Sequence, residues 1–193
     1  MADNAHPRFT LIGSGLSGAL LAAYLGRSGY EVDLYERRED PNAGNFVGGR
    51  SINLALSTRG IAALERVGIA KDVLAAAIPM RGRMIHGPRG DLHYQPYDKD
   101  PSRYINSIGR AALNSATIAA AQKHANVRVH FNHRCTEVDL DRPAAKLIKT
   151  TTNEHIEAVS DIVIGVDGAF SAVRRSMQRL DRFDYWQDYL RHG

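Results

Sequence analysis

The chain of 193 residues is long enough for one domain, or for one domain and part of another. Its formal net charge of +4 comes from basic residues scattered along the sequence, which argues against a nucleic-acid-binding protein and suits small anionic ligands. A single cysteine, Cys135, excludes an internal disulfide framework and favours a reducing compartment, so we expect a cytoplasmic protein. No apolar run resembles a signal peptide or approaches the length of a membrane span. We therefore expect any membrane anchor of a longer parent protein to lie outside this chain.

The first predicted elements surround a glycine-rich turn. Phe9 to Ile12 is a short apolar run that predicts a buried strand, and an apolar stripe with helical spacing follows over Leu16 to Arg27. Between them, Gly13, Gly15 and Gly18 have the spacing G-x-G-x-x-G. In such a turn the first glycine permits the sharp bend, the second lets the backbone approach a pyrophosphate, and the third lets the helix pack closely.

A second predicted strand, Glu31 to Tyr35, is followed by Glu36, which lies 18 residues after Gly18. A carboxylate at this place accepts hydrogen bonds from both ribose hydroxyls of an adenosine and repels a 2′-phosphate. The site therefore favours FAD or NAD over NADP, and this stretch alone does not decide between the first two. Strand, turn, helix, second strand and terminal acid in register predict a dinucleotide site rather than a structural turn.

The rest of the chain alternates short strands and short helices. In chain order we expect a loop over 37–49, an extended segment over 51–56, a helix from Ser57 to Arg66 that stops at Gly68, and a short helix over 71–77. A hairpin of strands 80–86 and 91–97 follows, and then an amphipathic helix over 107–126. The last elements expected are three strands over 127–131, 134–140 and 145–150 that form a meander, a buried strand over 161–166, and a short helix over 171–177. We expect 161–165 to be a parallel neighbour of the first two strands in one sheet.

A second nucleotide signal follows the last of these strands. The strand delivers Asp167 to its carboxyl end, which is the edge where open α/β sheets bind ligands. Gly168 permits close backbone approach, and Ser171 begins a helix whose first turn can face a phosphate. A simple Asp-Gly turn is the alternative. Together with the three-strand insert, this signal favours a flavoprotein over a dehydrogenase.

Five segments of the sequence carry a resemblance to a known family: GRSINLALSTRGIAALERVG, IPMRGRMIH, HFNHRCTEVDL, IGVDGAFSAVRRSM and RFDYWQDYLRHG. They resemble the kynurenine 3-monooxygenase family of FAD-dependent aromatic hydroxylases, from about Phe9 to Gly193. The resemblance implies an α/β fold of the glutathione-reductase-like FAD-binding type, with a Rossmann-type βαβ unit, a parallel sheet and a β-meander. It also implies bound FAD, NADPH as co-substrate, and transfer of one oxygen of O₂ to the 3-position of L-kynurenine.

The resemblance assigns cofactor contacts residue by residue. Those implied are Gly13, Gly15, Ser17 and Gly18 at the pyrophosphate, Tyr35, Glu36, Arg37 and Arg38 around the adenosine, Arg50 and Ala55 near the flavin, Arg110 at phosphate or ribityl oxygens, Cys135 and Ala172 through backbone, and Asp167 with Gly168 in the second flavin motif, which also faces NADPH. For the substrate, Arg83 and Tyr97 match the pair that holds the amino-acid carboxylate of kynurenine. A guanidinium fork binds a carboxylate bidentately and a phenol adds a directional hydrogen bond. The alternatives are a solvated arginine and a half-buried packing tyrosine.

The resemblance also implies a division of the chain. The FAD-binding domain takes 1–78 and 107–180, the substrate-binding region begins at 79–106, and 181–193 begins a further part of the substrate domain. The family pattern continues past Gly193, and the aromatic tail Phe183, Tyr185, Trp186 and Tyr189 has no following element to bury it, so we expect an amino-terminal fragment that ends before the full substrate-binding sheet.

Three functions stay open at this point. They are the kynurenine hydroxylase, a related flavin hydroxylase of another aromatic acid, and an FAD- or ADP-binding fragment without turnover. The sequence contains no nucleophile triad, and His130, His133 and Cys135 match no closed set of metal ligands, since strand alternation points His130 away from His133. The oligomeric state is not indicated.

Overall fold

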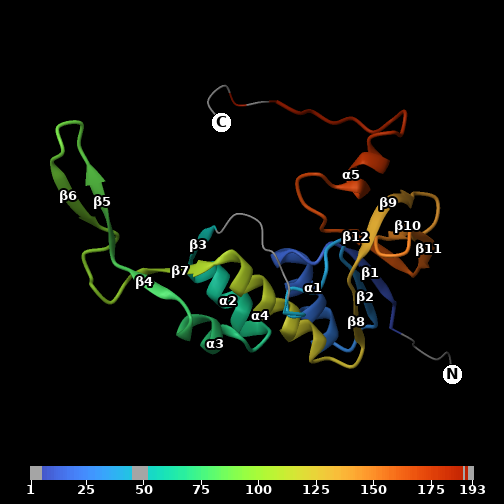
Figure 1. Ribbon diagram of the computed structural model, residues 1–193, viewed down its shortest axis with the longest axis horizontal. Coiled ribbons are helices and arrows are strands. Elements are labelled where there is room, and N and C mark those ends of the chain that lie inside the picture. The colour runs from blue at the N-terminus through green and yellow to red at the C-terminus, as the bar shows by residue number, and fades with distance from the viewer. Residues whose placement is uncertain (1–5, 45–51, 189, 191–193) are drawn as a thin grey trace.

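The computed structural model describes residues 6–44, 52–188 and 190. Four short parallel strands form its central sheet, in the order β12-β1-β2-β8 (Figure 1). The strands are β1 (Phe9–Ile12), β2 (Val32–Tyr35), β8 (Val127–His130) and β12 (Ile162–Gly165). The expected pairing of the first two strands with the last one is confirmed, because β1 lies between β2 and β12 and is parallel to both.

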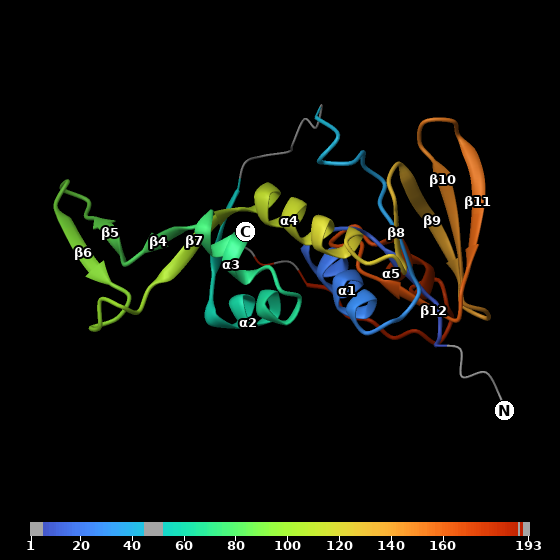
Figure 2. The same ribbon diagram turned by 90° about the horizontal axis from the view of Figure 1, so that it is seen from below.

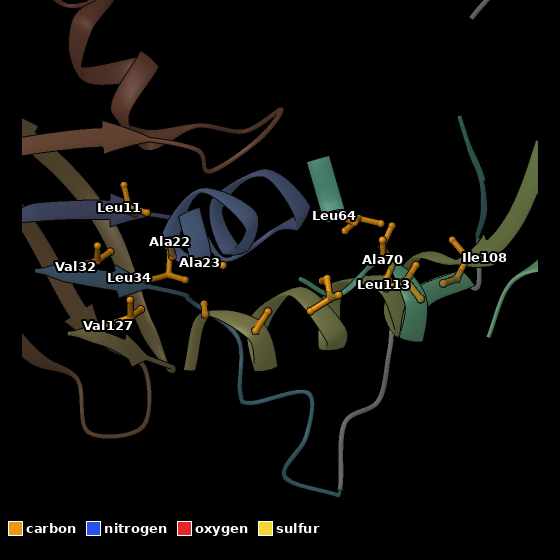
Figure 3. Packing of buried hydrophobic residues seen from close by; sticks show 14 of the residues in the cluster. Leu11, Ala22, Ala23, Val32, Leu34, Leu64, Ala70, Ile108, Leu113 and Val127 are labelled. Atoms are coloured by element: carbon orange, nitrogen blue, oxygen red, sulfur yellow. The ribbon is translucent and has the colours of Figure 1, made fainter. Parts of the chain in front are cut away.

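Two helices cover one face of this sheet. They are α1 (Leu16–Arg27) and α4 (Arg110–Gln122), which pack against each other as well as against the strands. The buried positions of α1 are all glycine or alanine, so its backbone comes close to the sheet. Figure 3 shows Leu11, Val32 and Leu34 of the strands gathered around Ala22 and Ala23 of the helix. Burial of this apolar cluster therefore fixes α1, and with it the turn that precedes the helix.

A three-stranded antiparallel meander covers the other face (Figure 2). Its strands are β9 (His133–Asp139), β10 (Ala144–Lys149) and β11 (Glu154–Val159), and the short helix α5 (Ala172–Met177) packs on β9. A second apolar cluster joins the two layers, with Ile12 and Tyr35 from the parallel sheet, Val138, Ala145 and Leu147 from the meander, and Val173 from α5. The parallel sheet is thus covered on both faces, as its apolar strands require.

A second, smaller sheet lies beyond α4. It has the order β3-β7-β4, with strands β3 (Asn53–Leu56), β4 (Ile78–Met80) and β7 (Ile105–Gly109), and the helices α2 (Thr58–Arg66) and α3 (Ala70–Ala75) connect β3 to β4. Ser57 is the N-cap residue of α2 as expected, although its side chain makes no capping hydrogen bond, and Gly68 follows the helix at φ +76°. The hairpin β5 (Gly82–His86) and β6 (Leu92–Pro96) projects from this end, far from the parallel sheet in both views (Figures 1 and 2).

Two expectations about the secondary structure are wrong, one about where a helix begins and one about which strands form the meander. The helix expected over 107–126 begins only at Arg110, because 105–109 is the middle strand of the second sheet and buries Asn106 and Ile108. The expected meander of 127–131, 134–140 and 145–150 is also wrong in its first member. The segment Val127–His130 joins the parallel sheet as β8, and the third meander strand is Glu154–Val159, whose mostly exposed side chains gave no apolar run. Strand periodicity does not say which sheet a strand enters.

Two further features concern the exposed parts of the chain. Phe183, Tyr185 and Trp186 are exposed, as expected for the aromatic tail, while Tyr189 lies outside the described residues. Among the helices that the structure describes, none has the length and apolar character that crossing a membrane requires.

Candidate dinucleotide-binding site

The glycine turn between β1 and α1 lies directly against the loop that follows β12. Gly13 has φ +104°, a backbone conformation that glycine adopts without strain, and its N–H donates to the carbonyl of Tyr35 over 2.8 Å. A Cβ on Gly13 would lie 2.7 Å from Cα of Asp167 and 2.8 Å from the carbonyl oxygen of Val166. Only a glycine fits here, so the two nucleotide signals of the sequence meet at one edge of the sheet.

Gly15 and Gly18 differ in what surrounds them. A Cβ on Gly18 would lie 1.9 Å from the carbonyl oxygen of Gly13, so this glycine is required by the packing of α1 on the turn. A Cβ on Gly15 would meet nothing within 4 Å, and its φ of −61° suits any residue. No contact within the described chain therefore explains the second glycine, whereas a ligand lying against the start of α1 does. Ser17, in the first turn of the helix, is exposed.

Glu36 lies at the carboxyl end of β2 and reaches back to the glycine turn. Its Oε2 accepts the backbone N–H of Ser14 over 2.9 Å and the Ser14 hydroxyl over 3.2 Å, while its Oε1 accepts the N–H of Arg38 over 3.0 Å. The carboxylate is partly buried, and Arg37 and Arg38 beside it are exposed. Ser14, which is 2% exposed, was not expected from the sequence, although its place inside the glycine motif could have indicated it.

Asp167 holds the first turn of α5. Its Oδ1 accepts the hydroxyl of Ser171 and its Oδ2 accepts the N–H of Ala172, both over 2.6 Å. Gly168 follows with φ +78°, and a Cβ there would meet nothing within 4 Å. At both Gly168 and Gly15, the space that a Cβ would occupy is thus free of atoms of the described chain. Ala172 itself is buried, so its amide serves the fold and is already satisfied by Asp167.

Cys135 lies in β9, close to this loop. Its thiol is half-buried, and Sγ approaches the carbonyl oxygen of Glu137 over 3.5 Å. Burial, and next the nearby Asp167 carboxylate, raises the pKa of the Cys135 thiol to about 11. The thiol is therefore neutral near pH 7 and a poor nucleophile, so it is a packing residue beside the site rather than a reactive one.

An ionic cluster around the buried carboxylate of Asp33 was not expected from the sequence. Asp33 of β2 is 2% exposed and accepts from Arg8 over 2.6 Å, from Arg128 over 2.9 Å and from His130 over 2.8 Å. Burial alone would raise the pKa of Asp33, but the hydrogen bonds from His130, Arg128 and Arg8 outweigh it and hold that pKa well below its ordinary value. The carboxylate is ionised at neutral pH and ties β2 to β8 and to the segment before β1.

The expectation that His130 points away from His133 is wrong. Their ring centroids lie 5.9 Å apart, because β8 ends at the first histidine, β9 begins at the second, and a turn separates them. His130 also stacks on Tyr35, with centroids 4.5 Å apart and planes at 14°. The Tyr35 ring is therefore buried, and burial followed by the Asp33 carboxylate raises the pKa of its phenol. The Tyr35 carbonyl accepts the Gly13 N–H in the glycine turn.

The remaining expected cofactor contacts are spread along α4 and the second sheet. Arg110 is the first residue of α4, is exposed, and its N–H donates to the carbonyl of Ile52 over 2.9 Å. Ala55 is exposed on β3, opposite Ser107 of β7. Arg50 lies outside the described residues. The structure thus brings the adenosine and pyrophosphate candidates together, while Arg110 and Ala55 extend the line of candidates toward the second sheet.

Arg83 and Tyr97 lie on the projecting hairpin. Arg83 is paired with Gln95 across β5 and β6, and Tyr97 directly follows β6, where its N–H donates to the carbonyl of Arg81 over 3.0 Å. The Nε of Arg83 donates to Oε1 of Gln95 over 2.8 Å, and both candidates are exposed. Tyr97 also lines a cavity of about 860 Å³ whose walls come from α2, α3, β4, β7 and the segment 97–106. Arg83 is not among the lining residues of that cavity, so the described chain does not enclose the pair in one pocket.

A family model described as an FAD binding domain matches residues 9–182. The chain belongs to the FAD-binding domain family. The open sides of Gly15 and Gly168, the fixed Glu36 carboxylate and the free first turn of α1 form a cradle that fits the adenosine and pyrophosphate of this cofactor.

The chain is also similar to individual proteins. It is 44% identical over 193 residues to the kynurenine 3-monooxygenase of Myxococcus xanthus (strain DK1622), with 100% of this chain and 42% of that protein covered. It is 45% identical over 186 residues to the one of Drosophila melanogaster, with 96% and 40% covered. The chain therefore spans about two fifths of the length of these curated relatives. The solved flavin-dependent monooxygenase PieE, in complex with FAD and substrate, superposes with a TM-score of 0.75 at 21% identity over 92% of this chain and 33% of that one, which shows the fold.

Proposed function

We propose that this chain is the FAD-binding part of a kynurenine 3-monooxygenase, an enzyme that uses NADPH and O₂ to hydroxylate L-kynurenine at its 3-position. One observation carries the proposal. The glycine turn, the Glu36 carboxylate and the Asp167 loop meet at one sheet edge, in a chain 44% identical to a relative of that activity.

The residues of the chain divide the work of holding the cofactor. Glu36 accepts the ribose hydroxyls of the adenosine. Its Oε1 carries only the bond from Arg38 and keeps one acceptor site, and the Ser14 hydroxyl, which makes the longer of the two bonds to Oε2, can rotate away to free a second. The free N–H groups at the start of α1 face the pyrophosphate, and Gly15 leaves room for it. Bound FAD supplies the redox and oxygen-transfer chemistry, while the protein supplies position and electrostatics.

The substrate end of the proposal rests on the hairpin. Arg83 presents a guanidinium fork that binds the amino-acid carboxylate of kynurenine, and Gln95 orients this fork through its Oε1. Tyr97, the residue that follows β6, adds a hydrogen bond from its phenol. A related hydroxylase of another aromatic acid would keep the same cofactor site and differ in what this hairpin recognises.

The test uses the purified chain and a full-length enzyme that contains it. We expect the chain to retain flavin absorbance after incubation with FAD and gel filtration, and the full-length enzyme to form 3-hydroxykynurenine while it oxidises NADPH. Glu36→Ala should lose the flavin, and Glu39→Ala, which removes an exposed carboxylate three residues further along, should keep it. A chain that retains no flavin sinks the cofactor assignment. A flavin-loaded full-length enzyme that hydroxylates p-hydroxybenzoate and not kynurenine sinks the substrate assignment.

A second candidate is an FAD-binding protein without turnover. The observation in its favour is that Arg83 and Tyr97 lie on an exposed hairpin and do not line one cavity together. In the experiment above, this candidate predicts retained flavin and no product from kynurenine, whatever the length of the chain.

A further inference from the structure

We infer that Asn132, in the turn between β8 and β9, is a positioning residue for the adenosine end of the cofactor and acts through Glu36. The inference rests on the proposed FAD site. It adds a residue from the β8 side of Glu36, whereas Ser14 contacts Glu36 from the β1 side. Its basis is a set of backbone contacts between two segments that are about 95 residues apart in sequence.

The segment after β2 and the turn after β8 are joined by three backbone hydrogen bonds. The N–H of Glu36 donates to the carbonyl of His130 over 2.9 Å, and the N–H of His133 donates to the carbonyl of Glu36 over 2.7 Å. The N–H of Asn132 donates to the carbonyl of Arg38 over 2.9 Å. The turn therefore holds the backbone of the segment 36–38 at both ends.

This backbone in turn fixes the Glu36 carboxylate. Oε1 accepts the N–H of Arg38, which is the residue whose carbonyl Asn132 holds. Oε2 accepts the N–H and the hydroxyl of Ser14 in the glycine turn. A shift of the β8–β9 turn would therefore move one donor to Glu36 and the main chain that carries Glu36, while the glycine turn stays in place.

The turn itself is anchored on both of its other sides. Asn132 has φ +61°, in the left-handed region, and its carbonyl accepts the N–H of Thr150 over 2.7 Å at the end of β10. Before it, the His130 ring is held by Asp33 and stacked on Tyr35. Asparagine and glycine tolerate this φ, whereas a β-branched residue does not, so the residue type decides whether the turn keeps its geometry.

The chain contains a matched control for this backbone conformation. Asn153, in the turn between β10 and β11, has φ +59° and donates its N–H to the carbonyl of Lys149 over 2.8 Å. It belongs to a hairpin of the meander and makes no contact with the segment 36–38 among the hydrogen bonds of the described residues. Asn153→Val therefore introduces the same local strain as Asn132→Val without reaching Glu36.

The experiment compares Asn132→Val, Asn132→Gly and Asn153→Val in two measurements. In calorimetric titrations, the dissociation constant of FAD should rise about tenfold or more for Asn132→Val, which corresponds to the loss of about one hydrogen bond to a charged group. It should be unchanged for the other two variants. Amide exchange of the FAD-free chain should show faster exchange of the Ser14 and Arg38 amides in Asn132→Val only. Both valine variants should lower the midpoint of thermal unfolding, so stability alone does not produce this pattern.

A double variant tests whether the effect passes through Glu36. In a Glu36→Ala background, Asn132→Val should weaken FAD binding little further, because the group it positions is gone. Equal FAD affinity of Asn132→Val and Asn153→Val, or protected Ser14 and Arg38 amides in Asn132→Val, would overturn the inference. A wild-type chain that binds no FAD overturns the proposed function instead, and the amide exchange then decides the positioning of Glu36 by itself.

Discussion

Ser14 donates both its backbone N–H and its hydroxyl to one oxygen of Glu36, over 2.9 and 3.2 Å. This contact joins the glycine turn after β1 to the carboxyl end of β2 before any ligand is considered. Ionised carboxylate oxygens accept up to about two hydrogen bonds each, so the bonds from Ser14 and Arg38 orient Glu36 and leave acceptor capacity on Oε1. The ribose site is therefore preorganised, which reduces the free-energy cost of binding.

We expect Glu36→Ala to weaken FAD binding by about 1.5–3 kcal/mol, the range for hydrogen bonds to a charged group. Fluorescence titration of the apoprotein with FAD measures this directly. The same variant also leaves the amides of Ser14 and Arg38 without their acceptor, so its thermal unfolding should be followed in parallel. Unchanged FAD affinity in a folded Glu36→Ala variant would contradict the ribose assignment.

Gly15 and Gly18 provide a second prediction because alanine should lower FAD affinity at the first position and the stability of the fold at the second. Gly18→Ala places a Cβ about 1.9 Å from the carbonyl of Gly13 and should destabilise the fold by about 1–3 kcal/mol or more. Gly15→Ala meets nothing within 4 Å and should change the free energy of unfolding by only about 0.5 kcal/mol. Its FAD affinity should nevertheless fall, since the methyl group occupies the space in which the pyrophosphate lies.

Urea unfolding and FAD titration of the two glycine variants separate these effects. A Gly15→Ala variant with wild-type stability and wild-type FAD affinity would show that the pyrophosphate does not approach this residue. A Gly18→Ala variant of wild-type stability would show that α1 does not need its close packing on the turn.

The parts of this fold that sequence predicts well are those whose signals are local. The strand, glycine turn, helix and second strand from Phe9 to Glu36 follow one another within 28 residues, and each has its own residue pattern. The strand 105–109 was missed because its two isoleucines are separated by Asn106 and Ser107, which leaves no alternation of apolar and polar residues, and its partners are the distant segments 53–56 and 78–80. The strand 127–130 was recognised as a strand, but its place beside β2 depends on long-range packing.

The same distinction applies to the site. Glu36 and Asp167 end apolar strands and were found for that reason, whereas the ionic partners of Asp33 lie 25, 95 and 97 residues away from it. No local pattern links Arg8, Arg128 and His130 to one carboxylate. Asn132 has the same character, because its part in holding the segment 36–38 follows only from the tertiary pairing of two turns.

The Asp33 cluster predicts a pH dependence of stability. Because the folded state holds the pKa of Asp33 below its ordinary value of 3.8, the cluster stabilises the fold fully above about pH 4, and this stabilisation is lost as the pH falls further. Asp33→Asn should lower the free energy of unfolding at pH 7 by about 2–3 kcal/mol, less than for a fully enclosed pair because Arg8 and Arg128 are half-exposed. The difference between variant and wild type should shrink below about pH 4.

Glu157→Gln is the matched control for the loss of one negative charge. Glu157 pairs with Arg142 on the surface, so its neutral variant should lose less than about 1 kcal/mol at any pH. Urea unfolding at pH 7 and pH 3 measures both variants. If the deficit of Asp33→Asn were as large at pH 3 as at pH 7, the ionised carboxylate would not be the source of the stabilisation.

The last prediction concerns Arg83 in the full-length enzyme. If its guanidinium binds the substrate carboxylate, Arg83→Ala should weaken the binding free energy of kynurenine by about 2–5 kcal/mol while FAD stays bound. The dissociation constant of kynurenine should therefore rise by a factor of roughly tens to thousands. Arg83→Lys should recover only part of this affinity, because an ammonium group lacks the planar fork. Gln95→Ala should cost less than Arg83→Ala, since it removes the group that orients the guanidinium and leaves the charge.

A kynurenine analogue without the carboxylate separates recognition from folding. It should bind wild type and Arg83→Ala with similar affinity, because the group that Arg83 contacts is no longer present. Arg89→Ala removes an exposed arginine at the tip of the same hairpin and should leave both ligands unaffected. If Arg83→Ala lost affinity equally for kynurenine and for the analogue, the side chain would support the hairpin through Gln95 rather than bind the substrate. The carboxylate of the substrate would then need another partner.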